Sequence, residues 1–134
     1  MPNLTGFHHV TFTVTDLARS AAWYIRVLGL TKAWEMPDME GRGRKIALLV
    51  PATDLRVVLV THAKATGGVA DEMNTGLDHL AFAVPGREEL ELWHAHFEAL
   101  GIDHSPIKQG ATGWLIAFRD PDNLQLEVYT LGNG

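Results

Sequence analysis

The chain has 134 residues, which suits one compact domain or two small halves that share a core. Apolar residues make up 46% of it, and the absence of cysteine excludes disulfide bonds and thiolate metal sites. The formal net charge is −5 with scattered basic residues, so no nucleic-acid partner is expected. Because no apolar run approaches a membrane span and no signal-peptide pattern is evident, we expect a cytoplasmic protein without a membrane partner.

The first half of the chain predicts a strand, a helix and three further strands. Residues 8–14 alternate between apolar and polar side chains, which indicates a strand. Residues 17–28 carry an apolar stripe at helical spacing, with Thr15 or Asp16 as N-cap and Gly29 just past the C-terminus. Three strands follow, near residues 31–36, 44–50 and 56–62.

A segment rich in glycine and small polar residues, 64–75, separates this half from a second one and is predicted to be a linker. The second half repeats the order of elements. It has a strand at 78–84, a helix at 87–100 and strands near 105–109, 113–118 and 124–130. The prediction is one α+β domain of two tandem βαβββ modules, module 1 at about 6–63 and module 2 at about 76–131.

An internal repeat supports this division. Residues 6–14 read GFHHVTFTV and residues 76–84 read GLDHLAFAV, an offset of 70. Four positions are identical in the two segments, namely Gly6/Gly76, His9/His79, Phe12/Phe82 and Val14/Val84. The repeat therefore places a histidine at the start of the first strand in each module.

Strand parity turns three potential metal ligands away from the helices. Side chains alternate faces along a strand, so Phe12 should pack on the helix while His9 faces away. The same parity turns His79 and Glu127 away from the second helix. Two imidazoles and one carboxylate predict a facial site for one divalent ion, namely Fe, Mn, Ni, Co or Zn, with positions left open for substrate or water.

The alternative for any single residue of this kind is a structural or surface role, which is the commoner one for a lone histidine on a strand. The other histidines are assigned such roles: His8 on the helix-facing side at the entrance of the first strand, His94 and His96 on a solvated helix face, and His62 and His104 at strand ends. Asp120 and Asp122, in the motif RDPDN, are predicted to shape a turn, where Asn123 tolerates a left-handed conformation.

Three segments together resemble the vicinal oxygen chelate superfamily, which includes glyoxalase I, extradiol dioxygenases, fosfomycin-resistance thiol transferases, methylmalonyl-CoA epimerase and bleomycin-binding proteins. They are HHVTFTVTDLARSAAWYIRVLGL, GLDHLAFAV and FRDPDNLQLEVY. They carry His9, His79 and Glu127 at the ligand positions of that superfamily, and Asn123 stands where its last motif usually has glycine. The resemblance implies a cupped mixed sheet around the metal, a substrate that chelates it through adjacent oxygens, and a homodimer.

A fourth ligand helps to separate branches of this superfamily. Glyoxalase I and the epimerase usually carry one on the last strand of the first module. The position 68 residues before Glu127 is Leu59, which cannot ligate, and Val57 and Thr61 should share its face. The resemblance therefore implies three protein ligands, an apolar wall at Leu59 and little glyoxalase I activity.

Two functions remain open, ahead of a third in which the chain is a structural interaction module and the histidines are incidental. The first is a metal-dependent enzyme acting on a small oxygen-chelating substrate, with extradiol-dioxygenase-like or lyase-like chemistry. The alternative is a non-catalytic protein that binds a small molecule or antibiotic, as in the bleomycin-resistance branch. Thr11 and Tyr129 are candidate hydrogen-bond donors in the cavity, although packing at its rim is an equal alternative for Tyr129.

Overall fold

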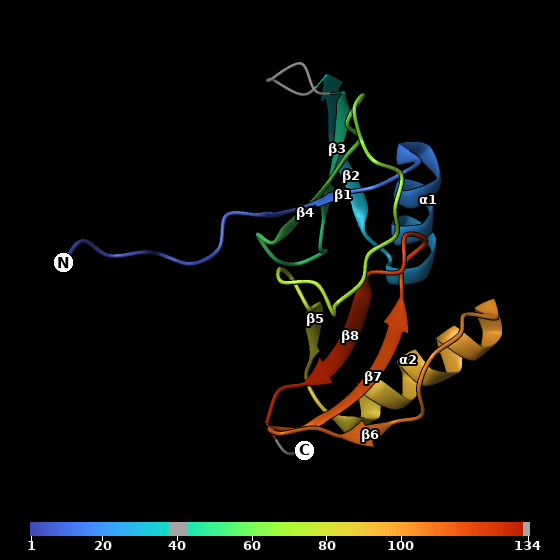
Figure 1. The fold of residues 1–134 in the computed structure, drawn as a ribbon. Helices are drawn as coiled ribbons and strands as arrows, with labels where there is room; N and C mark the ends of the chain where they lie inside the picture. The colour runs from blue at the N-terminus through green and yellow to red at the C-terminus, as the bar shows by residue number, and fades with distance from the viewer. Residues whose placement is uncertain (38–42, 133–134) are drawn as a thin grey trace. The chain divides into compact units, whose positions relative to one another are not determined.

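The computed structural model describes residues 1–37 and 43–132, and it divides into two compact units, Met1–Gly68 and Val69–Gly134. Each unit consists of one helix and a four-stranded mixed sheet, in the order βαβββ (Figure 1). The predicted α+β class with two tandem βαβββ modules is confirmed.

The first unit contains β1 (Val10–Thr13), α1 (Leu17–Leu28), β2 (Thr31–Pro37), β3 (Arg44–Leu49) and β4 (Arg56–Val60). Its sheet has the order β1-β4-β3-β2, in which β1 runs parallel to β4 and the other neighbours are antiparallel. The parallel pair is possible because α1 and two strands separate β1 from β4 along the chain.

The second unit repeats this topology with β5 (His79–Val84), α2 (Arg87–Leu100), β6 (Lys108–Gln109), β7 (Trp114–Arg119) and β8 (Gln125–Thr130). Its sheet has the order β5-β8-β7-β6, with β5 parallel to β8. In both units the first strand is therefore an edge strand of its sheet, paired on one side with the last strand of the unit.

Both helices occupy the predicted residues; a side-chain cap begins α1, and a glycine ends each helix. The Asp16 side chain accepts a hydrogen bond from the Arg19 backbone N–H at 3.0 Å, as expected of an N-cap residue. Gly29 and Gly101 end the two helices with φ of 71° and 68°, a left-handed conformation that glycine adopts without a side-chain clash.

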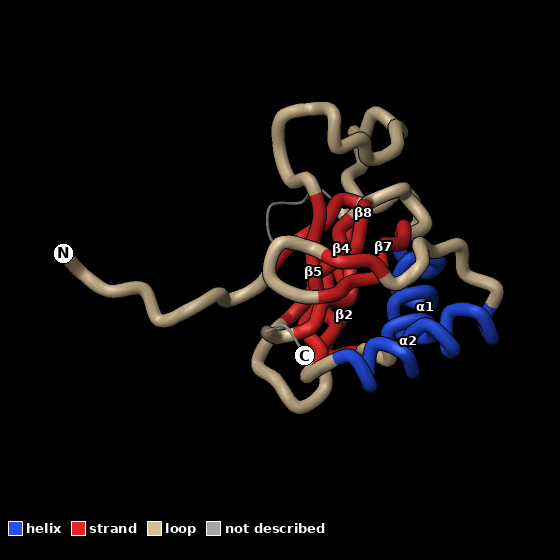
Figure 2. The backbone as a smooth tube through the Cα atoms, turned by 90° about the horizontal axis from the view of Figure 1, so that it is seen from below, coloured by secondary structure: helices blue, strands red, loops and turns tan. Residues whose placement is uncertain are grey.

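Each helix lies along one side of its own sheet (Figure 2). Aromatic side chains make the contact in both units. In the first unit Phe12 stacks on Tyr24 with ring centroids 6.4 Å apart. In the second unit Phe97 packs on Phe118 at 4.7 Å. All four side chains are buried, which confirms that Phe12 faces the helix. Alternation along β8 turns Glu127 to the opposite face of the second sheet.

The tight turn between β7 and β8 has the structure predicted for RDPDN. Asp120 Oδ1 accepts hydrogen bonds from the backbone N–H groups of Asp122 and Leu124, at 2.9 and 2.8 Å. Asn123 has φ of 70°, so it occupies the left-handed conformation that glycine would otherwise supply. The turn fixes where β8 begins, and therefore the register of Glu127.

Two predicted segments differ from the structure. The strand expected at 105–109 shrinks to Lys108–Gln109, because the Ser105 hydroxyl takes the Ala117 N–H at 2.9 Å and Pro106 has no N–H to pair. The second half of the expected linker, residues 69–75, belongs to the second unit. Ala70 N–H donates to Asp122 O at 2.8 Å, so this segment is tied to the β7–β8 turn.

Across residues 1–37 and 43–132, neither helix is long and apolar enough to cross a membrane.

Candidate metal centre

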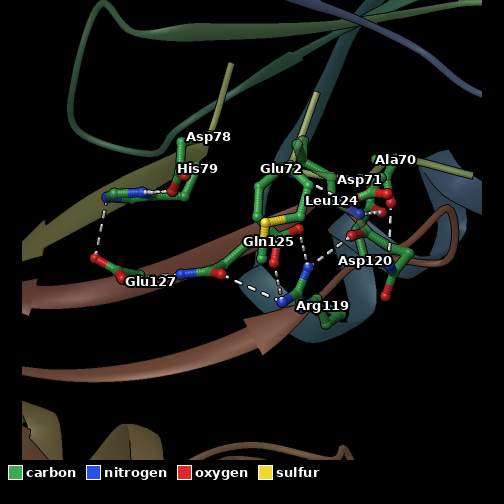
Figure 3. Close-up of polar contacts among 12 residues, drawn as sticks. Ala70, Asp71, Glu72, Asp78, His79, Arg119, Asp120, Leu124, Gln125 and Glu127 are labelled. Atoms are coloured by element: carbon green, nitrogen blue, oxygen red, sulfur yellow. Dashed lines mark hydrogen bonds and ion pairs between the residues drawn. The ribbon is translucent and has the colours of Figure 1, made fainter. Parts of the chain in front are cut away.

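His79 and Glu127 come together on the second unit (Figure 3). They reach each other from β5 and β8, which are neighbouring parallel strands, and His79 Nε2 lies 3.4 Å from Glu127 Oε1. Glu127 is a buried carboxylate, with 8% of its surface exposed. A carboxylate at this depth needs a positive charge or hydrogen-bond donors around it, and His79 is one of its two partners.

The protonation of His79 is constrained by its other neighbour. His79 Nδ1 lies 2.7 Å from Asp78 Oδ1, and an ionised carboxylate only accepts, so Nδ1–H donates to Asp78. In a neutral imidazole this directs the Nε2 lone pair toward the anionic Glu127. A cation bound by both atoms would remove the repulsion between the Nε2 lone pair and the Glu127 carboxylate. Metal-ligating histidines typically donate their second N–H to a carboxylate in this way.

Glu127 is also held from its far side. Gln125 Nε2 donates to Glu127 Oε2 at 3.3 Å, and Arg119 Nη2 donates to Gln125 Oε1 at 3.3 Å. Arg119 in turn binds both carboxylate oxygens of Glu72, at 2.7 and 2.8 Å. This chain of contacts orients the amide of Gln125 so that its N–H points at Glu127, leaving Oε1 of Glu127 directed at His79.

The Arg119 guanidinium has a strong effect on Glu72. Its hydrogen bonds lower the pKa of Glu72 to about 2, and the pKa of Arg119 is raised by the same pairing. Glu72 is thus ionised and engaged. Sequence analysis placed it in a linker, whereas the structure fastens that segment to β7 through this bidentate pair.

His9 lies in the first unit, directly before β1, and is exposed. Its Nδ1 contacts His8 Nδ1 at 2.7 Å, so one of the two rings donates and the other accepts, and His9 Nε2 takes no part in that contact. The expectation that His8 packs toward the helix is wrong: it precedes the strand and is exposed, because the alternation of faces begins only at Val10.

The two candidate hydrogen-bond donors, Thr11 and Tyr129, differ in their surroundings. Thr11 lies on β1 facing away from α1 and is exposed. Tyr129 shares the face of Glu127, but its hydroxyl accepts the Thr112 backbone N–H at 3.2 Å, and the hydrogen bonding at residue 112 lowers the pKa of Tyr129. Tyr129 therefore packs against the turn before β7, which is the rim role that the sequence left open.

The sequence predicted Leu59 as the residue of the first unit that corresponds to Glu127, and this prediction was wrong by one position. Glu127 pairs with Ala81 and Ala117, and the residue that pairs with Thr11 and Ala47 in the same way is Val58. Leu59 instead pairs with Phe12 and Ile46 on the helix-facing side and is fully buried there. The offset between the last strands is 69 rather than 68 residues, and a shift of one residue exchanges the faces of a strand.

A family model described as the Glyoxalase/Bleomycin resistance protein/Dioxygenase superfamily matches residues 6–128. The chain belongs to this superfamily. The predicted membership of the vicinal oxygen chelate superfamily is therefore confirmed, over nearly the whole chain.

Solved structures of the superfamily share the fold. A glyoxylase/bleomycin resistance protein/dioxygenase domain from Frankia sp. EAN1pec is 33% identical, with a TM-score of 0.83 over 98% of this chain and 100% of that one. A mutant of the fosfomycin resistance protein FosX from Listeria monocytogenes, complexed with Mn(II) and 1S,2S-dihydroxypropylphosphonic acid, has 20% identity and a TM-score of 0.70 (95% and 90% covered). Lactoylglutathione lyase from Agrobacterium tumefaciens has 20% identity and a TM-score of 0.73 (96% of each chain).

Sequence reasoning missed three residues that support the pair. Asp78 directly precedes His79, and Gln125 lies two positions before Glu127. Their closeness in sequence to the predicted ligands was the signal that could have identified them. Arg119 had none, because its link to Glu72 spans 47 positions. Polar side chains of these kinds reveal a supporting role only once the strands are paired.

The Glu72–Arg119 pair gives a pH-dependent prediction. Because the folded-state pKa of Glu72 is lowered from 4.5 to about 2, its contribution to stability is present above pH 4.5 and is lost as the pH falls through about 2. The Glu72 carboxyl carbon should keep its ionised NMR chemical shift at pH 3.5. In Arg119→Met it should titrate at higher pH, whereas Arg87→Met, which removes an arginine elsewhere in the unit, should change nothing. Identical titrations of Glu72 in all three proteins would contradict this pairing.

Proposed function

We propose that this superfamily member is a divalent-metal-dependent enzyme that acts on a small substrate offering two adjacent oxygens. The observation that carries the proposal is the contact between His79 Nε2 and the buried Glu127 carboxylate, 3.4 Å apart, with Asp78 fixing the tautomer of His79. Two ligands that each bond one ion at about 2.0–2.2 Å are compatible with such a separation. A protein that merely sequesters a drug has no need of this arrangement, which favours the enzyme.

His9 completes the proposed ligand set. The repeat aligns His9, which directly precedes β1, with His79, the first residue of β5. The Nε2 atom of His9 lies outside the contact with His8. Two imidazoles and one carboxylate suit Fe, Mn, Ni, Co or Zn and leave coordination positions open. When bound, the ion would act as a Lewis acid on the substrate oxygens.

The surrounding side chains suggest the kind of substrate. Ala81 and Ala117 flank Glu127 on its own sheet and leave space beside it. In the first unit the residue that corresponds to Glu127 is Val58, so an apolar side chain stands at this position instead of a carboxylate. A substrate with a hydrophobic body and paired oxygens fits best, which supports extradiol-dioxygenase-like or lyase-like chemistry on such a molecule.

Replacing Glu127 tests the metal site. Glu127→Gln should weaken Mn(II) binding, measured by isothermal titration calorimetry, by more than the ~10–100-fold that the loss of an outer-shell partner causes, because a charged ligand is removed. Glu91→Gln is the matched control, since Glu91 is an exposed partner of Arg87 on α2. Equal affinities in these two variants would rule Glu127 out as a ligand.

The position that distinguishes glyoxalase chemistry is Val58, and not Leu59 as the sequence predicted. Val58→Glu adds a carboxylate on the face of Thr11 and should tighten Mn(II) binding by at least about tenfold, the scale of a metal-site partner. Leu59→Glu should instead destabilise the first unit by ~3–5 kcal/mol, because it buries an unpaired charge under α1. Urea unfolding measures the second effect.

The wild-type chain should turn over methylglyoxal and glutathione only weakly with Ni(II) or Zn(II). Position 58 carries valine, so no carboxylate is present there to act as a base. Robust activity in that assay would overturn this part of the proposal.

We also propose a homodimer as the working assembly. The N-terminal segment before β1 extends from the first unit (Figure 1) and exposes apolar side chains, with Leu4 at 96% and Phe7 at 93% exposure. Such side chains gain free energy when a partner covers them. Light scattering at micromolar concentration should give twice the chain mass of 14.7 kDa; a monomeric mass would refute it.

A further inference from the structure

A second cluster of metal-ligand side chains lies at the C-terminal end of α2. His94, Glu98 and His104 bring one ligand atom each to within 4.8 Å of one another. The cluster lies on the helix-covered side of the second sheet, since α2 packs on β7 through Phe97 and Phe118. Glu127 faces the other side of the same sheet. The cluster is therefore separate from the site proposed above.

The backbone brings these residues together from two directions. His94 and Glu98 are four positions apart on α2 and so share one face of the helix. His104 follows the helix end at Gly101 and is held by a bridge to Phe118 of β7. Its ring also packs edge-on against His94, with centroids 4.9 Å apart. The imidazole of His104 is thus fixed, with 7% of its side chain exposed.

The contacts of His104 direct its Nε2 atom at the Glu98 carboxylate. His104 Nδ1 lies 2.7 Å from the Ser105 carbonyl oxygen, which can only accept, so Nδ1–H is the donor. His104 Nε2 lies 2.8 Å from Glu98 Oε1. At this distance a proton lies between the two atoms, and both atoms can instead bind a metal ion once that proton is displaced. Metal-ligating histidines almost always donate their second N–H to a carboxylate, a backbone carbonyl or water, and His104 makes such a contact.

The helix end favours a cation at the same place. The C-terminus of a helix carries partial negative charge, and the last turn of α2, residues 97–100, contains Glu98 and no basic residue. The carboxylate adds to that negative charge, so a cation bound by Glu98 and the two imidazoles is stabilised by both.

The first unit shows that the fold does not need this cluster. When the two helix ends are aligned at Gly29 and Gly101, an offset of 72, the three positions are Ala22, Arg26 and Lys32. There Arg26 itself supplies positive charge in the last turn of α1. In the second unit, Glu98 stands at the position of Arg26, and two histidines stand at the positions of Ala22 and Lys32. These three side chains can bind a cation taken up from solution.

We propose that His94, Glu98 and His104 form a second binding site for a divalent transition-metal ion of the zinc type, which ties the end of α2 to the segment leading into β6. Two imidazoles and a carboxylate suit Zn(II). Glu98 is exposed, with 64% of its side chain accessible, so the ion can enter from solvent. Its bonds replace the proton between His104 and Glu98.

The test uses Zn(II) alone as the probe, in a chain that lacks the first site. His9→Ala/His79→Ala/Glu127→Gln should still bind one equivalent of Zn(II) by calorimetric titration, and Zn(II) should raise its melting temperature by mass action. Adding His94→Ala should abolish both effects. Adding His96→Ala instead, on the same helix but outside the cluster, should preserve both. His94 is the informative position because its removal leaves the contacts of His104 with Ser105 and Glu98 in place.

The wild-type chain provides a second measurement if the triple variant does not fold. Its Zn(II) stoichiometry should fall from two to one on His94→Ala and stay at two on His96→Ala. A fall in stoichiometry from one to zero on His94→Ala would support the second site. It would also show that the site proposed at His9, His79 and Glu127 does not bind Zn(II). Unchanged stoichiometry on His94→Ala, or an equal loss with His96→Ala, would overturn the second site and leave only an imidazolium–carboxylate ion pair at His104.

Discussion

The pairing of β8 between β5 and β7 is the constraint on which the candidate metal centre depends. It aligns Glu127 with Ala81 on one side and Ala117 on the other, so the carboxylate emerges between two small side chains on the face away from α2. The Asp120 turn sets the start of β8. A slip of one residue would send Glu127 into the helix-packed core and bring Leu126 to the open face.

Buried negative charge then explains the polar contacts around this strand. Glu127 has His79 on one oxygen and Gln125 on the other, and Arg119 fixes Gln125 while neutralising Glu72. Each partner is itself held by another group. Such support keeps a ligand in position before the ion arrives, which reduces the entropy lost on binding.

The two modules share a fold but differ in the charge they carry at matching places. Glu127 in the second unit is matched by Val58 in the first, and Glu98 in the second is matched by Arg26. In both comparisons the second unit carries the carboxylate and the first an apolar or basic side chain. Because both sequences keep the same apolar pattern toward the helix, the fold tolerates these exchanges. The second unit has become the one richer in metal-ligand side chains.

Local signals in the sequence were sufficient for most of the secondary structure, the strand expected at 105–109 excepted. Alternation predicted the strands, and Asp16, Gly29 and Gly101 marked the helix ends, because caps and periodicity act within a few residues. The facing directions of His79 and Glu127 followed from the same alternation, and the repeat led to the prediction that His9 is a third ligand. These features depend on side-chain geometry along one strand, which a sequence displays directly.

Relations between strands were decided only by tertiary structure. The repeat could not reveal that Val58 rather than Leu59 matches Glu127, since loop lengths before the last strands differ by a residue and only hydrogen-bond register assigns the faces. Nor could it reveal Arg119 with Glu72, or His104 returning to Glu98 across the helix end. Side chains distant in the chain meet because packing and strand pairing bring them together, and no local pattern records such a meeting.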